Sequence, residues 1–465
     1  MSIKSLLIPV ENQVREFDPK LLLAYVAAKH GFTSIIGPRR EIHFRIASYP
    51  PSIYLSKSIT VHSDMMFKIM HNLGHGIVAW DEEALVHLPP EIYFSRRLSP
   101  VALSYVSHLF AWGEDNAALW RQYDQLPAGA KIHVTGNPRG DLLRPEMRPF
   151  FEQEVAKLRG KYGDFILINT NFNHVNSFSP VQNLFQPTKK AGEKPRFGRA
   201  ARGMTREYAE GLRDHKQAIF AAFQRLIPWL AKTFPDYNVV VRPHPTENPG
   251  IYQQIASKCQ RVYVTNKGNV VPWLWATRLV IHNGCTTGVE AYVMGVPAVS
   301  YRAKINEYYD YGFYRLPNLL SHQCFDFDEL QETLAGILAG KLGPAEGAER
   351  QALIEHYLAS RQGPLACERM VAVLEQMAAG ESELPQPSRR QRLEGRAVAA
   401  GRMIVKRCKS RLPGSHNKPA FQRYRYPGVT LPEVRAKIAR FRRVLGDARE
   451  VQAEQIAEQF FRISS

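Results

Sequence analysis

The stretch that decides the fold is Val239-Val-Val-Arg-Pro-His-Pro245, followed downstream by Val280-Ile-His-Asn-Gly-Cys-Thr-Thr-Gly-Val-Glu-Ala-Tyr-Val-Met-Gly-Val-Pro-Ala-Val-Ser-Tyr301. Each part holds a short β-branched run that ends in turn-forming residues, which predicts a buried parallel strand. The first strand ends at Arg242 and His244, a cation and a polar ring. The second opens into Gly284-Cys-Thr-Thr-Gly288, which predicts a turn leading into a helix near Val289.

Both strand ends suit a phosphate group. Free backbone N–H groups and the positive end of a helix dipole make such a turn an anion site. Ligands of open α/β sheets bind at the carboxyl ends of the strands. The sequence therefore predicts a nucleotide-linked substrate whose phosphate is held by Arg242, His244, Thr286 and Thr287. The alternative for His244 is a capping role at a strand–loop junction, and for the threonines a helix N-cap.

Length and composition bound the class of protein. A chain of 465 residues predicts two domains and an appendage. With 45% hydrophobic and 11% aromatic residues it is not a disordered protein. Its five cysteines are scattered without a CxxC pair, which argues against a disulfide framework or a zinc site and favours a reducing cytosol. No signal-peptide core follows the first strand, and no apolar run reaches the roughly 18 residues that span a bilayer.

The positive charge is concentrated in a tail. Residues 389–443 contain 17 basic and two acidic residues, a net charge of +15 out of +18 for the whole chain. A helix predicted over Arg389–Leu412 places an apolar stripe among the cations, formed by Leu393, Ala397, Ala400, Ile404 and Cys408. This pattern is typical of a helix lying on an anionic membrane. Docking on the enzyme body or RNA binding are the alternatives, but no nucleic-acid recognition motif accompanies the charge.

Strands alternate with helices along the first 145 residues, which predicts βαβ units and a parallel sheet. A helix is expected at Lys20–His30. Strands are expected at 6–10, 33–36, 53–55, 76–80, 108–112 and 131–135.

A second α/β unit is predicted from Phe165 onward. Its strands are expected at 165–170, from 239, at 261–265, from 279 and at 298–301, with helices at about 149–159, 208–233, 328–342 and 344–379. The polar loop 171–202 is too long for an ordinary connection, so it is either a lid or disordered. Residues 381–388 are interpreted as a linker. The predicted domains are an N-terminal acceptor domain (1–150), a nucleotide-sugar domain (160–345), helices packing on the body (346–380) and a basic helical extension (381–465).

The order of motifs resembles a known architecture. Thr135-Gly-Asn-Pro138 is followed by a strand into Asn169-Thr-Asn171, then by Arg242-Pro-His-Pro245 and by Gly284-Cys-Thr-Thr-Gly-Val-Glu-Ala291. This order resembles the GT-B plan, in which two Rossmann-like domains face an interdomain cleft. Many glycosyltransferases and the UDP-N-acetylglucosamine 2-epimerases have this plan. In GT-B enzymes a carboxylate at the position of Glu290 would hold the ribose; the alternative is a first-turn carboxylate that complements the helix dipole.

A narrower resemblance covers about residues 1–375. Segments such as Ile8-Pro-Val-Glu-Asn-Gln-Val-Arg-Glu-Phe-Asp18, Trp80-Asp-Glu-Glu83 and Trp112-Gly-Glu114 resemble the bacterial surface carbohydrate biosynthesis protein family. Its His-Pro motif is shared with bacterial sialyltransferases and with β-Kdo transferases of capsule and lipopolysaccharide. The resemblance implies a CMP-activated, Kdo-like donor.

Carboxylates after two strands are the candidates for acid/base chemistry. Glu82 lies in Asp81-Glu-Glu83, while Glu114 and Asp115 follow the 108–112 strand. Crowded carboxylates raise one another's pKa, which suits a general acid or base, although acidic residues are also common at solvated helix starts. Candidates for substrate binding are Glu11 and Arg15 after the first strand and Asn169, Asn171 and Asn173 after the 165–170 strand; turn formation is the alternative for the asparagines.

The sequence thus predicts a cytoplasmic, peripheral GT-B glycosyltransferase of surface polysaccharide. It would move a Kdo-like sugar from CMP to a lipid-linked glycan at the inner leaflet. No DxD-like metal site stands out in the sequence, so we expect neither a metal nor any cofactor besides the nucleotide-sugar donor. A UDP-sugar 2-epimerase, which would need no basic tail, and a non-catalytic assembly partner are the alternatives.

Overall fold

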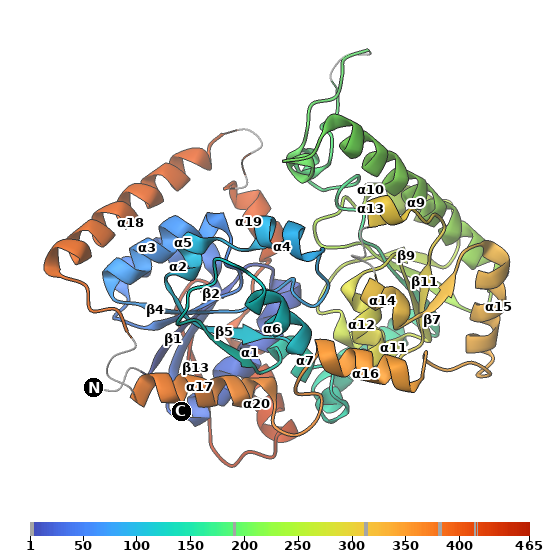
Figure 1. The fold of residues 1–465 in the computed structure, drawn as a ribbon. Coiled ribbons are helices and arrows are strands. Elements are labelled where there is room, and N and C mark those ends of the chain that lie inside the picture. Colours follow the sequence, from blue (N-terminus) through green and yellow to red (C-terminus); the bar gives the residue numbers. More distant parts are fainter. Residues whose placement is uncertain (1–3, 189–191, 311–314, 380–383, 413–414, 416) are drawn as a thin grey trace. The chain divides into compact units, whose positions relative to one another are not determined.

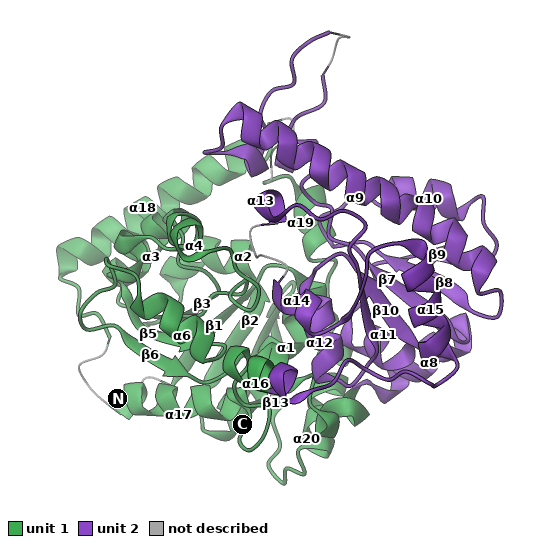
Figure 2. Ribbon diagram, turned by 45° about the vertical axis from the view of Figure 1, so that its right-hand side comes forward, with its two compact units in different colours: residues 1–150, 352–465 green, residues 151–351 purple. Residues whose placement is uncertain are grey.

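The computed structural model describes residues 4–188, 192–310, 315–379, 384–412, 415 and 417–465. The chain forms two compact units, the first made of residues 1–150 and 352–465 and the second of residues 151–351 (Figures 1 and 2). Each unit is built around its own sheet of parallel strands connected by helices. The predicted α/β class with two Rossmann-like units is therefore confirmed, while the predicted cleft between the units stays a prediction.

The sheet of unit 1 has the order β13-β14-β2-β1-β3-β4-β5-β6. The six predicted strands are present and pair in parallel: β1 (Ser5–Val10), β2 (Thr33–Pro38), β3 (Ile53–Ser56), β4 (Gly76–Ala79), β5 (Val106–Ala111) and β6 (Lys131–Val134). The chain builds outward from β1 in both directions, with β2 on one side and β3 on the other. The carboxyl ends of β1 and β3 therefore form the topological switch point, where ligands of such sheets bind.

The helix predicted at Lys20–His30 begins earlier, because α1 spans Gln13–Lys29. Pro19 lies inside this helix rather than marking its start. The carboxylate of Glu16 accepts the backbone N–H groups of Glu11 and Asn12 just ahead of the helix, which stabilises the earlier beginning. The other helices of residues 1–150 are α2 (Arg39–Phe44), α3 (Asp64–Leu73), α4 (Pro90–Arg97), α5 (Pro100–Leu103), α6 (Glu114–Arg121) and α7 (Pro138–Asp141), with 3₁₀ segments at η1 (Ile46–Ser48), η2 (Val61–Ser63) and η3 (Pro145–Phe151).

The C-terminal part of the chain belongs to unit 1. The region predicted as one helix at 344–379 forms α16 (Ala348–Tyr357) and α17 (Ala366–Ala379). The basic extension contains α18 (Arg389–Lys409), α19 (Pro419–Arg425) and α20 (Leu431–Val444). It is not wholly helical as predicted, because β13 (Gln452–Ala457) and β14 (Phe460–Ser464) form a hairpin that adds antiparallel to β2. Residues 381–383 of the predicted linker lie outside the described residues.

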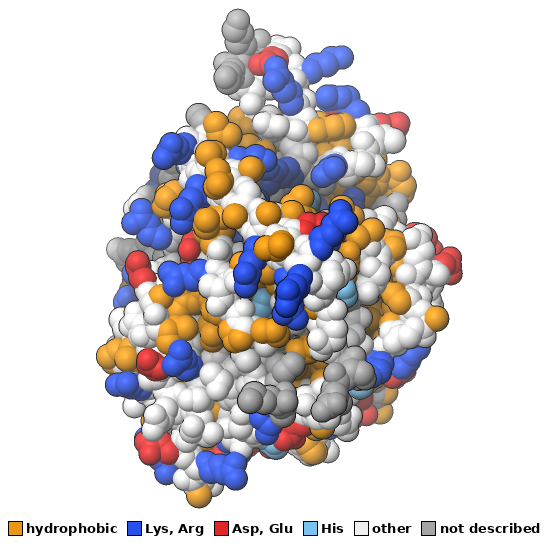
Figure 3. All heavy atoms as spheres, turned by 90° about the vertical axis from the view of Figure 1, so that its left-hand side faces the viewer, with side chains coloured by type: hydrophobic (Ala, Val, Ile, Leu, Met, Phe, Trp, Pro, Cys, Tyr) orange, Lys and Arg blue, Asp and Glu red, His pale blue; other side chains and the backbone are white. Residues whose placement is uncertain are grey.

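Helix α18 turns different faces to the protein and to solvent. It packs on α3 through the face that contains Gly395 and Ala399, whereas all five residues of the predicted apolar stripe are exposed. Figure 3 shows Lys and Arg side chains interspersed with hydrophobic ones on the face where α18 lies. Among the described residues, no helix combines the length and the apolar composition needed to cross a bilayer.

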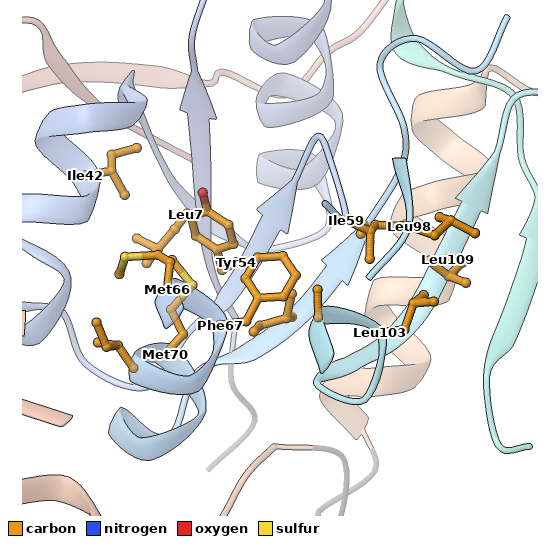
Figure 4. Packing of buried hydrophobic residues seen from close by; sticks show 14 of the residues in the cluster. Leu7, Ile42, Tyr54, Ile59, Met66, Phe67, Met70, Leu98, Leu103 and Leu109 are labelled. Carbon is orange, nitrogen blue, oxygen red and sulfur yellow. The ribbon is translucent and has the colours of Figure 1, made fainter. Parts of the chain in front are cut away.

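Apolar side chains of α3 cover one face of the sheet in unit 1. Met66, Phe67 and Met70 are buried there and pack with Leu7 of β1 and Tyr54 of β3 (Figure 4). Burying each such side chain is worth about 1.5–3 kcal/mol. This cluster packs against β1 and β3, so the polar groups that follow these two strands are supported by a packed core.

Unit 2 has the order β12-β11-β10-β7-β8-β9, all parallel. This is the classical doubly wound order with β7 as first strand, so the switch point lies between β7 and β10. Its strands are β7 (Phe165–Asn169), β8 (Asn238–Arg242), β9 (Val262–Val264), β10 (Leu279–His282), β11 (Ala298–Tyr301) and β12 (His322–Cys324), the last of which the sequence did not predict. Its helices are α8 (Glu152–Tyr162), α9 (Arg206–Thr233), α10 (Gly250–Ala256), α11 (Val271–Ala276), α12 (Thr286–Val293), α13 (Glu307–Asp310), α14 (Arg315–Leu319) and α15 (Phe327–Leu338).

The long loop predicted at 171–202 has a small core of its own. Leu184, Phe185 and Ala201 are buried against Ala209 and Leu212 at the start of α9. The loop contains two 3₁₀ segments, η4 (Pro180–Gln182) and η5 (Arg199–Ala201), and a bridge between Phe185 and Phe197. Its described part is thus an ordered segment packed on α9. Residues 189–191 of this loop lie outside the described residues.

Candidate functional site

The turn at the end of β10 is built on a buried, neutral histidine. Nδ1 of His282 accepts the backbone N–H of Gly284 at 3.0 Å, and Nε2 lies 2.9 Å from the hydroxyl of Ser321. The Ser321 hydroxyl donates in turn to the carbonyl of Pro317, so the ring nitrogen Nε2 carries the proton. Burial lowers the pKa of His282 to about 3, which keeps the ring uncharged.

Helix α12 begins at Thr286, directly after this turn, and not near Val289 as predicted. Glu290 is therefore beyond the first turn of the helix, which corrects its predicted first-turn position. Gly288 packs against the ring of His282, since an added Cβ would lie 2.4 Å from Nε2. Glu290 is buried, and its charge helps raise the pKa of the Cys285 thiol. Its predicted contact with a ribose stays a prediction.

The first residues of α12 directly follow this turn, and the backbone N–H of Gly288 donates to the carbonyl of Cys285 at 3.0 Å. Cys285 is the N-cap residue, but its side chain makes no capping hydrogen bond. Thr286 and Thr287 are half-buried, and the hydroxyl of Thr287 contacts the thiol of Cys285. Burial raises the pKa of Cys285 to about 11, so the thiol is not a nucleophile. The start of α12 combines a helix N-terminus with two hydroxyl side chains, and its predicted binding of phosphate stays a prediction.

His244 lies in a loop after β8 that a buried carboxylate holds in place. Nδ1 of His244 accepts the backbone N–H of Thr246 at 3.3 Å and lies 2.8 Å from its hydroxyl. A ring that accepts at Nδ1 carries its proton at Nε2 when neutral, so Nε2–H is a hydrogen-bond donor. The carboxylate of Glu247 accepts the backbone N–H of His244 and the hydroxyls of Thr170 and Tyr252.

Glu247 was not singled out from the sequence, although it is fully buried. Burial raises its pKa, and its hydrogen bonds to Tyr252, to Thr170 and to backbone N–H groups act in the opposite direction. It joins the end of β7, the loop after β8 and helix α10. Its position three residues after His244 was the available signal, but the contacts that define its role are long-range.

Arg242 is held by contacts with the loop after β9 and with Trp273. Its two terminal nitrogens donate to the carbonyls of Lys267 and Gly268, at 2.8 and 2.9 Å. The guanidinium lies over the ring of Trp273, 5.0 Å from its centroid. Burial lowers the pKa of Arg242 to about 9. These contacts favour an anchor for the loop after β9; the predicted phosphate contact of Arg242 stays a prediction.

Unpaired polar groups lie at the switch point of unit 2. Asn169 is the last residue of β7 and only 4% exposed, and neither its amide nitrogen nor its amide oxygen has a hydrogen-bond partner among the described residues. The side-chain oxygen of Asn171 is likewise buried without one. The backbone of Asn171 is tied to the side chain of Asn283 by two hydrogen bonds, at 3.0 and 3.3 Å. Buried polar groups without partners are costly, so a ligand that bonds to them would remove that cost.

A pocket of about 450 Å³, part of it open to solvent, lies at the same edge of the sheet. Asn171 and Asn283 line it on either side of the switch point. Three cations contribute to its lining, Lys216 of α9 and Arg302 and Lys304 after β11. Asp310 is the one carboxylate among the described lining residues, and it is paired with His215 at 2.9 Å. The balance of charge favours an anionic ligand.

The carboxylates predicted in unit 1 have different environments. Glu82 is buried, accepts the indole N–H of Trp80 at 2.9 Å and pairs with Arg139 at 3.5 Å. Burial raises the pKa of Glu83, but the charges of Arg15, Arg97 and Lys57 outweigh burial and lower the pKa to about 2. The hypothesis that crowding raises the pKa values in this group is thus wrong for Glu83. Arg15 pairs with Glu83 at 2.9 Å.

Asp115 and Glu114 are adjacent but differently placed. Glu114 is half-exposed and pairs with Arg121 on the surface of α6, which favours a structural role. Asp115 lies 2.8 Å from Nε2 of His87, a histidine that the sequence did not indicate. Nδ1 of His87 must donate to the carbonyl of Leu88, so the proton between Nε2 and Asp115 is shared by the pair.

Burial lowers the pKa of His87, but the hydrogen bonds to Asp115 and Leu88 outweigh it and raise the pKa above its ordinary value. A histidine with a raised pKa holds a proton near neutral pH. The pair can therefore take up or release a proton, which Glu114 is not placed to do.

Glu11 is part of an ionic network at the switch point of unit 1. Its carboxylate pairs with Arg39, Lys57 and Arg425, at 2.9, 2.8 and 2.6 Å. Burial raises the pKa of Glu11, but these cations outweigh it and hold the pKa well below its ordinary value. Within the described part of the chain, no group of three His, Cys, Asp or Glu side chains could hold a metal ion. Metal independence stays a prediction.

No model of a known protein family matches the sequence. No curated protein matches it either. Solved structures with a similar fold include the UDP-GlcNAc 2-epimerase of Neisseria meningitidis bound to UDP-GlcNAc, with 12% identity, a TM-score of 0.45 and coverage of 80% of this chain and 100% of that chain. The wall teichoic acid polymerase TagF has 12% identity, a TM-score of 0.47 and coverage of 81% and 88%. The UDP-GlcNAc 2-epimerase of Methanocaldococcus jannaschii has 11% identity, a TM-score of 0.46 and coverage of 81% and 100%. Similarities of this extent say nothing about the activity of the chain.

Proposed function

We propose that the protein is a glycosyltransferase that uses a nucleotide-activated sugar and acts in bacterial surface polysaccharide biosynthesis. One observation supports this proposal above the others. The switch point of unit 2 brings together the N-terminus of α12, a cation-lined pocket, and the amide of Asn169 and side-chain oxygen of Asn171, which have no partner in the described part of the chain. Phosphate, ribose and base of a nucleotide need these kinds of groups.

In this proposal the donor phosphate binds at the start of α12. The backbone N–H groups and hydroxyls of Thr286 and Thr287 would contact its oxygens, and Nε2–H of His244 would donate a further hydrogen bond. Glu290 would bind the ribose. When the acceptor hydroxyl attacks the anomeric carbon, the sugar–phosphate bond breaks and the nucleotide leaves with the bonding electrons. Donors fixed before the reaction stabilise that leaving charge.

The acceptor hydroxyl must lose a proton as it attacks. We assign this step to Asp115 together with His87, because the pair shares a proton and lies at the start of α6 in unit 1. Glu82 is the predicted alternative, but its carboxylate is already bonded to Trp80 and Arg139. The resemblance in the sequence favours a CMP-activated, Kdo-like donor and a lipid-linked glycan acceptor.

The exposed face of α18 supports contact with an anionic membrane, where such an acceptor would be found. Leu393, Ile404, Val405 and Leu412 are 65%, 58%, 50% and 56% exposed. They lie among exposed arginines and lysines of the same segment. Exposed apolar side chains beside cations are typical of helices at the surface of anionic bilayers.

A thermal-shift titration with CMP, UDP and GDP tests the proposal. We expect CMP to stabilise the protein by about 2.7 kcal/mol when its concentration is a hundred times its Kd. UDP and GDP at the same concentration should stabilise it less. His244→Ala should remove most of this stabilisation. His322→Ala is the matched control, because within the described part of the chain the ring of this half-buried histidine of β12 bonds only to the carbonyl of Gly343.

The other outcomes have defined meanings. If no nucleotide stabilises the wild-type protein, the proposal is wrong. Equal loss in both variants would show that His244 has no specific role. Conversion of UDP-N-acetylglucosamine to its 2-epimer would identify the protein as an epimerase instead, and nucleotide binding without any transfer would favour a non-catalytic partner.

A further inference from the structure

The carboxyl edge of the sheet in unit 1 has an excess of positive charge. Two carboxylates there, Glu11 and Glu16, are paired with four cations, which are Lys20, Arg39, Lys57 and Arg425. Two further cations, Arg402 and Lys406 of α18, have no acidic partner within the described part of the chain. Uncompensated charge in a partly buried place is unfavourable unless a counterion binds.

The extension brings Arg402 and Lys406 to this edge by close packing of α18. A Cβ added at Gly395 would lie 3.1 Å from Cβ of Asn72, a tight contact, so glycine favours the close approach of α18 to α3. An ion pair of 3.2 Å between Glu394 and Lys68 fixes the same end of the helix. Farther along, α18 contacts α2, the helix that follows β2.

Arg402 and Lys406 are four residues apart and lie on the side of α18 that faces the protein. Both are half-buried, whereas Ile404, Val405 and Arg407 between and beside them are exposed. Residues four apart are neighbours on one face of a helix, so the two cations point to the same place.

Other polar groups of unit 1 lie around that place. Nε2 of His43 is 2.7 Å from the hydroxyl of Tyr54, and both groups feel the charge of Arg402. Burial, Arg39, Arg402 and Lys406 together hold the pKa of His43 well below its ordinary value, and Glu11 acts in the opposite direction. Burial and Arg39 also lower the pKa of Arg402. The cations therefore repel one another in the absence of a bound anion.

We propose that Arg39, Arg402 and Lys406, together with His43 and Tyr54, form a binding site for a phosphoryl group at the switch point of unit 1. Three cations suit a doubly charged monophosphate ester or a diphosphate ester. The C-terminal extension would thus complete a site of unit 1 with its inner face. Every residue of this site belongs to unit 1, whereas the residues that line the nucleotide pocket belong to unit 2.

The same chemistry could come from a soluble phosphate ester or from a lipid diphosphate. If the proposed function is correct, the lipid-linked acceptor supplies the phosphate, and the identity of this ligand rests on that function. The existence of an anion site does not rest on the proposed function, because it is inferred from the charges of unit 1 alone.

Binding of inorganic pyrophosphate, measured by calorimetry, tests the proposal. We expect the double variant R402Q/K406Q to bind at least tenfold more weakly than the wild type. The control R392Q/R396Q removes two exposed cations of the same helix with the same spacing, and it should change the affinity less than twofold. Equal losses in both variants, or no loss in R402Q/K406Q, would overturn the proposal.

Pyrophosphate could also bind in unit 2, so a reporter within the site is needed. The imidazole NMR signal of His43 provides it in the wild-type protein. A bound anion offsets the nearby cations, so the pKa of His43 should rise toward its ordinary value when pyrophosphate is added. An unchanged pKa at saturating pyrophosphate would contradict the site even if R402Q/K406Q failed to fold.

Competition identifies the source of the phosphate. If the natural ligand is a lipid, a long-chain alkyl diphosphate in neutral detergent micelles should displace pyrophosphate and bind more tightly than it does. If the natural ligand is soluble, a soluble ester such as glycerol phosphate should displace pyrophosphate and bind more tightly. Failure of both compounds to shift the His43 signal would overturn the proposal. CMP binding should persist in R402Q/K406Q, and pyrophosphate binding at His43 should persist in His244→Ala, so the two proposals fail independently.

Discussion

The switch points of the two sheets have the same topology but different chemistry. In unit 1 the carboxylates Glu11 and Glu16 are both ion-paired, and Glu16 and Lys20 are almost completely buried. In unit 2 it is organised by a neutral histidine, His282, while the amide of Asn169 and the side-chain oxygen of Asn171 are buried without a partner among the described residues. Ion pairs stabilise a strand end by themselves and leave only cations for a ligand, whereas buried amide groups without a partner among the described residues can bond to the polar groups of a nucleoside. For this reason the proposed function places the donor nucleotide in unit 2.

The largest expected effect concerns the ionic network. Glu16→Gln would leave Lys20 and Lys57 buried with one carboxylate fewer, and breaking a buried pair costs about 3–5 kcal/mol. Glu83→Gln is the control, since Glu83 is 48% exposed and pairs with the partly exposed Arg15. We expect it to cost less than about 1 kcal/mol. Urea unfolding measures both values; a small effect of Glu16→Gln would show that the network does not hold this edge.

A smaller effect is expected from pH, through unit 2. The pKa of His282 is about 3 in the folded protein and about 6.5 when unfolded. Above pH 6.5 both states are neutral, but below it only the unfolded state binds the proton, so stability falls as pH decreases from 6.5 toward 3. One such group contributes about 1.4 kcal/mol per pH unit.

His282→Asn keeps an acceptor for the N–H of Gly284 and removes the titrating ring. Its unfolding free energy should therefore decrease less steeply between pH 6.5 and 4 than that of the wild type. The difference in slope corresponds to one proton and is measured by denaturant unfolding at several pH values. Identical slopes would mean that His282 is not kept neutral by its site.

The smallest effect concerns the extension, which only unit 1 has. L393S/I404S should weaken binding to vesicles containing phosphatidylglycerol by about 1 kcal/mol, roughly fivefold, because less apolar surface enters the interface. F325S/L342S replaces two exposed apolar residues of unit 2 and should leave binding unchanged. Cosedimentation measures both. Equal binding of the wild type and both variants would show that the apolar residues of α18 do not contribute to membrane binding.

Local patterns predicted the strands and the two strand-end motifs because their signals lie within a few residues. The runs before Arg242 and Gly284 are β-branched and end in turn residues, and they form β8 and β10. The stripe of α18 was predicted from its spacing, and its five residues are exposed.

Other features depend on contacts that the sequence does not reveal. Glu247 acquires its role from Thr170, 77 residues away, and Asp115 from His87, 28 residues away. The hairpin at the C-terminus was missed because Gln452–Ala457 lacks a run of β-branched residues and is stabilised by pairing with β14, which adds to β2. Arg242 was predicted to bind phosphate because its position at a strand end was visible, while its carbonyl partners after β9 were not.

A crystal structure of the protein with CMP would test the central claim most directly. We predict that the phosphate lies within hydrogen-bonding distance of the backbone N–H groups at the start of α12 and of Nε2 of His244, with the nucleoside against Asn169 or Asn171. A nucleotide bound only at the switch point of unit 1, or away from the carboxyl edge of β7 and β10, would contradict the account.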